Sequence, residues 1–118
     1  MNLKYLLNES PTNQWRDRML EYDDEIFTEH RLELCNKALN NFINRLEEID
    51  PNRNDRDEQI MNGVKEVVIA FNELNEANEY FIETMEREEL AEFIEKIAQR
   101  AGLEIETGFD VTEQWREW

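Results

Sequence analysis

Residues 57–77 read DEQIMNGVKEVVIAFNELNEA, and this stretch decides the fold class. Its apolar residues recur every three or four positions, which is the period of one face of an α-helix. They are Ile60, Val64, Val67, Val68, Phe71 and Leu74. An apolar stripe of this kind is stable only when it packs against other elements. The stretch therefore predicts one helix of a packed bundle.

Three further segments predict helices that could pack on this one. Ser10 and Pro11 suit the N-cap and the first position of a short helix over residues 11–22, because serine accepts a free amide hydrogen and proline has none to offer. A longer helix is predicted from about residue 24 to 49. It ends before Pro51, since the residue preceding a proline is disfavoured in the helical conformation.

The third segment begins near Thr84, a suitable N-cap, and ends at Gly102, because glycine readily adopts the left-handed conformation that follows a helix. Residues 103–106 then alternate between apolar and acidic side chains, which predicts a short extended piece. Residues 110–113 read DVTE, a capping-box pattern that predicts a final helical turn.

Composition supports a single helical domain. The chain has 118 residues but only 3 Gly and 2 Pro, and such scarce chain punctuation favours long regular elements joined by few turns. The predicted fold is all-α: one domain over residues 1–118, built as a small antiparallel bundle of about four main helices with a short C-terminal helical turn.

Several classes of protein are excluded by the sequence. No apolar run approaches the roughly 18 residues of a membrane span, and the N-terminus lacks the pattern of a secretory signal. Cys35 is the only cysteine, which excludes an internal disulfide and fits a reducing cytoplasm. It lies on the apolar face of the 24–49 helix, where we expect it to pack as a small hydrophobic residue. A net charge of −16 argues against direct binding to nucleic acid.

Negative charge is concentrated between residues 72 and 95. This segment holds nine carboxylates and one cation, Arg87. The nine are Glu73, Glu76, Glu79, Glu83, Glu86, Glu88, Glu89, Glu92 and Glu95. Like charges three or four residues apart destabilise a helix, whereas a balanced helical surface would intersperse lysines. The imbalance favours a surface that attracts a basic partner.

Two aromatic residues close the chain. Trp115 and Trp118 would lie on one side of the final turn, and tryptophan is enriched at protein interfaces. We treat both as candidates for contact with a partner. The alternative is that the two indoles dock this last turn onto the protein's own bundle.

These features predict a small acidic cytoplasmic module that binds a basic protein, in the manner of an inhibitor or immunity protein, without enzymatic activity or a cofactor. The acidic residues would speed association and the aromatic residues would prolong it. A second possibility is a helical protein that self-associates, for example as a homodimer, through leftover apolar surface.

A third possibility is a Mg²⁺-dependent enzyme. Glu73 and Glu76 are three residues apart and would share one face of a helix, and Mg²⁺ prefers such oxygen ligands. In helical architecture and in this one spacing the chain resembles the all-α nucleotide pyrophosphohydrolases, which implies hydrolysis of a nucleotide. Other metal sites are not predicted. Residues 50–61 match only the start of a calcium-binding loop, and His30 with Glu33 is too small a set of ligands.

Overall fold

A computed structural model describes residues 2–22 and 27–118, and within these ranges the protein is all-helical, with no strand. A 3₁₀ helix, η1, spans Lys4–Glu9, and four α-helices follow it. They are α1 (Pro11–Tyr22), α2 (Glu29–Glu47), α3 (Arg56–Ala77) and α4 (Thr84–Arg100). The predicted helical bundle is confirmed.

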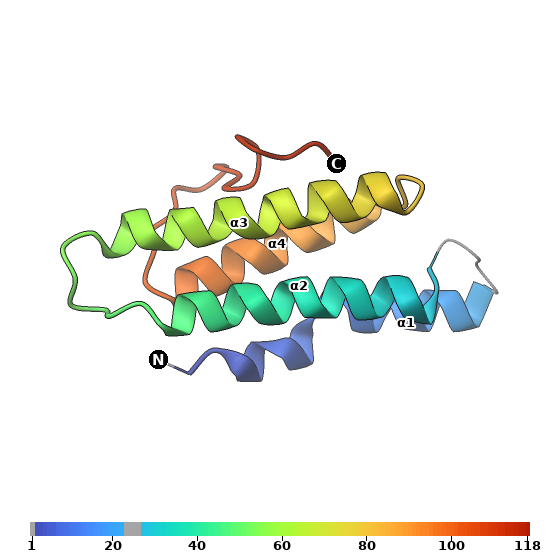
Figure 1. Cartoon of the computed structure of the whole chain (residues 1–118), viewed down its shortest axis with the longest axis horizontal. Helices are drawn as coiled ribbons and strands as arrows, with labels where there is room; N and C mark the ends of the chain where they lie inside the picture. The colour runs from blue at the N-terminus through green and yellow to red at the C-terminus, as the bar shows by residue number, and fades with distance from the viewer. Residues whose placement is uncertain (1, 23–26) are drawn as a thin grey trace.

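The bundle is elongated, with extents of 48 × 27 × 25 Å. Figure 1 shows α2 and α3 side by side and antiparallel in one layer, with α1 and α4 behind them. The C-terminal tail, residues 101–118, returns along α3. None of the helices in the described ranges is long and apolar enough to cross a membrane.

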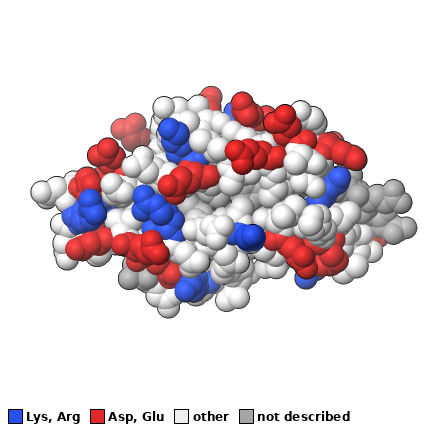
Figure 2. Space-filling model, viewed as in Figure 1, with Lys and Arg blue, Asp and Glu red and all other residues white. Residues whose placement is uncertain are grey.

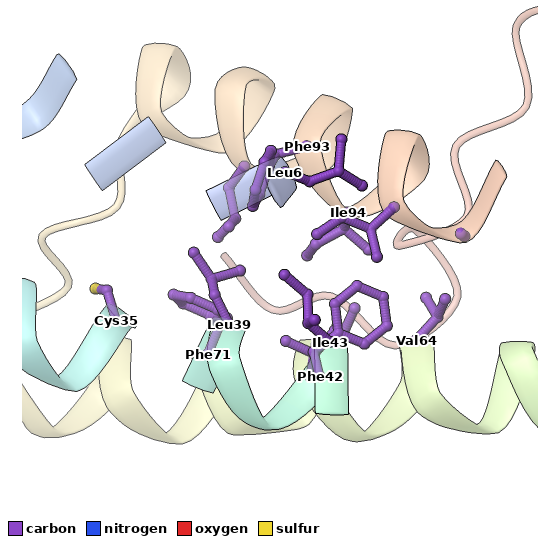
Figure 3. Close-up of a cluster of buried hydrophobic side chains, with 14 of the residues drawn as sticks. Leu6, Cys35, Leu39, Phe42, Ile43, Val64, Phe71, Phe93 and Ile94 are labelled. Carbon is purple, nitrogen blue, oxygen red and sulfur yellow. The ribbon is translucent and has the colours of Figure 1, made fainter. Parts of the chain in front are cut away.

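The apolar stripes of the helices meet in one continuous core. Figure 3 shows Leu39 and Ile43 of α2 and Phe71 of α3 facing Phe93 and Ile94 of α4. Apart from Leu74, which is half-buried, the stripe that predicted α3 is fully buried. Burial of these side chains supplies the main driving force that holds the four helices together.

Local signals set several helix ends as predicted. Pro11 is the first residue of α1, and the Ser10 hydroxyl oxygen accepts the Thr12 N–H at 3.3 Å. After α4, Gly102 has a φ of 115°, and the Leu103 N–H donates to the Ala98 carbonyl at 3.1 Å. This is the hydrogen-bond pattern that closes a helix on a left-handed glycine.

The predicted start of the second helix near residue 24 is wrong. Residues 23–26 lie outside the described ranges, and α2 begins at Glu29, where the Thr28 hydroxyl oxygen accepts the Arg31 N–H at 3.1 Å. Phe27 precedes the helix. It is buried and stacks on Trp15 with 5.3 Å between the ring centroids, a tertiary contact made just outside the helix.

The start of α4 differs slightly from the prediction, and the predicted final turn is present. Thr84 is the first residue of α4 rather than its N-cap, which is Glu83. Residues 103–106 form no strand, so the predicted extended piece pairs with nothing. The final turn forms over residues 111–115, where the Arg116 N–H donates to the Thr112 carbonyl at 3.0 Å.

The short helix η1 was not predicted. Its N-cap Leu3 and its residue Leu6 are buried, and the Leu3 N–H donates at 2.8 Å to the carboxylate of Glu47, the last residue of α2. The N-terminal segment is thereby fixed to the end of α2.

Candidate binding surface on α4 and the C-terminal tail

The nine carboxylates of residues 73–95 divide into two groups. Three form ion pairs within the protein, Glu79 with Arg31 at 3.8 Å and both Glu86 and Glu89 with Arg18. The remaining six have no ion pair to any residue in the described ranges, and they are Glu73, Glu76, Glu83, Glu88, Glu92 and Glu95. Pairing within the protein therefore engages Glu86 and Glu89 most, because the Glu79 side chain remains 89% exposed beside Arg31.

Glu86 and Glu89 hold α1 against α4. Glu86 is buried and lies 3.6 Å from the Arg18 guanidinium, and burial raises the pKa of its carboxyl group. Glu89 also pairs with Arg18 and accepts the Trp15 indole N–H at 3.3 Å. Removing one partner of such a partly buried pair is costly because the other charge is left uncompensated. These two carboxylates therefore serve the fold.

Three of the six unpaired carboxylates line one groove. Glu88, Glu92 and Glu95 lie along α4 and face the C-terminal tail across a groove of about 390 Å³. The tail contributes Gly108, Phe109, Asp110 and Arg116, and Arg87 and Ala91 complete the lining. We call this the acidic groove. It brings together parts of the chain that are separate in sequence.

The charges in the acidic groove repel one another. Burial raises the pKa of Glu95, and the nearby negative charges of Asp110 and Glu92 raise it further. Burial also acts to raise the pKa of Asp110, but hydrogen bonds from Thr112 and the Arg116 guanidinium outweigh it and hold this pKa below its usual value. Asp110 thus stays charged and adds to the negative potential at Glu95.

Phe109 stands between the acidic groove and a second one. Its side chain is 58% exposed, although it is a large apolar residue. It also lines a groove of about 350 Å³ whose other apolar walls are Met61, Leu103, Ile105 and Val111, with Glu104 and Glu106 at the edge. We call this the apolar groove. Sequence reasoning missed Phe109, and the available signal was a phenylalanine in the polar, turn-prone context TGFD.

Residues 13–118 match a family of unknown function, DUF5713. The chain belongs to this family. Comparison with curated proteins and with solved structures finds no match. The DUF5713 region contains all four α-helices except the first two residues of α1, and it contains both grooves.

The two candidate tryptophans of this DUF5713 protein pack on its own bundle. Trp118 is only 9% exposed and meets Phe71 edge to face, with 6.5 Å between the ring centroids. Trp115 is half-buried against the core. Asn72 secures both, because its side chain donates to the Trp115 carbonyl and accepts the Glu117 N–H. Little of Trp118 is left for contact with a partner.

Glu73 and Glu76, the pair considered for Mg²⁺, are exposed on α3 and do not line the acidic groove. Across residues 2–22 and 27–118, no three His, Cys, Asp or Glu side chains come together in a way that could hold a metal ion. Figure 2 shows the face formed largely by α2 and α3, where acidic and basic side chains are interspersed.

Proposed function

We propose that this protein binds a basic segment of another protein and acts as an inhibitory or immunity-type partner in the cytoplasm. The observation that carries the proposal is the acidic groove, where Glu88, Glu92 and Glu95 line one wall and form no ion pair with a residue in the described ranges. Burial and the repulsion from Asp110 and Glu92 raise the pKa of Glu95, and lysine or arginine side chains entering this groove would reduce that repulsion.

The whole-molecule charge supports the same proposal. A net charge of −16 attracts cationic proteins over a distance of about one Debye length, ~8 Å at physiological salt, and accelerates their association. Cys35 is buried and needs no oxidising environment, which suits a cytoplasmic protein.

Capture from a lysate at low and at high salt, with mass spectrometry of the bound proteins, tests this function. The test variant is the triple charge reversal Glu88→Lys, Glu92→Lys and Glu95→Lys. The matched control, Glu21→Lys, Glu33→Lys and Glu48→Lys, changes net charge equally at exposed positions outside the groove. Circular dichroism establishes that both variants stay helical.

We expect one basic protein to be captured by the wild type and the control at low salt, and to be lost at high salt and from the groove variant. Equal capture by the two variants would mean that net charge alone attracts proteins, and would overturn the proposal. A salt-independent dimer with no captured partner would favour self-association instead.

A further inference from the structure

The acidic and apolar grooves lie on either side of one residue, Phe109, which lines both. The segment from Leu103 to Val111 runs between α4, which forms the acidic wall, and Met61 near the start of α3. In Figure 1 this segment leaves the end of α4 and passes to α3. The two grooves thus border the same stretch of tail.

We infer that the two grooves form one docking surface for an amphipathic basic segment of the partner protein. Its lysine or arginine side chains lie over Glu88, Glu92 and Glu95, and its apolar side chains contact Phe109 and enter the apolar groove. This inference rests on the proposed function and specifies where, and by which chemistry, the partner is held.

Charge complementarity identifies the polar half of the occupant. The acidic groove is lined by four carboxylates and two guanidinium groups, so its walls carry net negative charge. One of the guanidinium groups, that of Arg116, is already paired with Asp110. A second copy of this chain is a poor occupant, because it brings a further net charge of −16 to the same surface.

The exposed side chain of Phe109 indicates that the bound segment also carries apolar side chains. Gly108 has a φ of 85° and open space around its Cα, and Phe109 follows it on this turn with most of its ring in solvent. An exposed aromatic residue beside an apolar groove and within a charged rim has the composition of an interface anchor. Lysine alone would leave the apolar groove empty, so the segment needs apolar side chains as well.

Exposed apolar side chains outside the two grooves offer competing contact sites that the same experiment can detect. Leu20, Tyr80 and Met85 are each more than half exposed, and they line neither groove. Tyr80 provides a matched control for Phe109, since both are exposed aromatic residues outside the helices.

The test uses the full chain labelled with ¹⁵N and three synthetic peptides of equal length. The first alternates lysine with leucine, the second replaces leucine by serine, and the third replaces lysine by glutamate. Amide chemical shifts map the contact site, and titrations at low salt give each Kd for the wild type, Phe109→Ala and Tyr80→Ala.

We expect the lysine–leucine peptide to shift amides in residues 88–95 and 103–111 and to bind more tightly than the lysine–serine peptide. Phe109→Ala should weaken the lysine–leucine complex about tenfold, as for an interface anchor, and leave the lysine–serine complex unchanged. Tyr80→Ala should change neither, and the glutamate–leucine peptide should not bind.

Equal binding of the two lysine peptides, with no effect of Phe109→Ala, would overturn this inference and leave the proposed function standing. Shifts centred on Leu20, Tyr80 and Met85 would also overturn it. Failure of both lysine peptides to bind at low salt would contradict the proposed function itself, and the docking surface with it.

Discussion

Asn75 organises the turn between α3 and α4. It is buried, its side-chain oxygen accepts the Ile82 N–H at 2.9 Å, and its carbonyl accepts the Tyr80 N–H at 2.8 Å. Glu79 and Tyr80 have φ values of 66° and 56°, a conformation that residues other than glycine seldom adopt. One asparagine therefore stabilises a turn whose backbone is otherwise unfavourable.

We expect Asn75→Ala to lower the free energy of unfolding by about 1–3 kcal/mol, because the buried Ile82 N–H loses its partner. Urea unfolding at neutral pH measures this change. Asn41→Ala is the control, since Asn41 is exposed on α2 and its replacement should cost no more than about 0.5 kcal/mol. An equally small effect of Asn75→Ala would show that the turn does not depend on this side chain.

Cys35 should be chemically inert in the folded protein. It is fully buried, and burial raises the pKa of its thiol from 9.0 to about 12. The folded state then binds the thiol proton more tightly than the unfolded state does, so stability falls as pH rises from 9 toward 12. A thiol-reactive dye at pH 8 should label Cys35 only after denaturant is added. Rapid labelling of the native protein would contradict this burial.

Among the elements, helices with strong local signals could be predicted closely. The stripe over residues 57–77 corresponds to α3 at Arg56–Ala77, and Gly102 follows the end of α4 as expected. The start of α2 was predicted too early: the Thr28 cap that begins it is a local signal, whereas the stacking of Phe27 on Trp15 is a distant contact that no local pattern shows. Six residues of 3₁₀ helix, as in η1, are too few to show a helical period.

The candidate site could be predicted only in part. The concentration of carboxylates in residues 73–95 is visible in the sequence. Which of them form ion pairs within the protein depends on the tertiary fold. Arg18, which takes two of them, is 68 and 71 positions away from Glu86 and Glu89. Phe109 lies beside α4 because the C-terminal tail folds back on the bundle. The local sequence pattern of the tail does not indicate where the tail will pack.

Two hydrogen bonds from Asn72 of α3 hold the end of the tail, beside the packing of Trp118 on Phe71. The Asn72 side-chain amide N–H donates to the Trp115 carbonyl at 2.8 Å, and its oxygen accepts the Glu117 N–H at 2.9 Å. We expect Asn72→Ala to speed hydrogen–deuterium exchange at residues 115–118 and to cost about 1–3 kcal/mol, since each hydrogen bond contributes about 1 kcal/mol. Exchange within α2 should not change. Unaltered exchange in the tail would mean that the docking of Trp118 is sufficient alone.

For the molecule as a whole, binding and stability make opposite demands on charge. Arg116 forms an ion pair with Asp110 within the acidic groove, whereas Glu92 and Glu95 form no ion pair with a described residue. A surface that binds a cationic partner has carboxylates close together in the free protein, where they repel one another. Removing one of those charges should therefore stabilise the free protein and weaken the complex.

The variant Glu95→Gln tests both effects of this charge, on the stability of the free protein and on binding. Because the folded-state pKa of Glu95 is raised, the folded protein binds its proton more tightly, and stability falls as pH rises through the unfolded and then the folded pKa. Glutamine does not ionise, so the variant does not lose this stability. At pH 7 and low salt its free energy of unfolding should exceed that of the wild type by about 0.2–0.5 kcal/mol, the cost of a like-charge pair such as Glu92 with Glu95.

The gain should shrink in high salt, which screens the repulsion, and should vanish below about pH 3, where the carboxyl groups are protonated. Thermal unfolding across pH and salt tests each point, with Glu33→Gln on the exposed face of α2 as the control. The same Glu95→Gln variant should bind the lysine–leucine peptide more weakly. A variant that is less stable than the wild type at pH 7 would show that the carboxylate of Glu95 serves the fold. A variant that binds the peptide as tightly as the wild type would show that this carboxylate does not serve a partner.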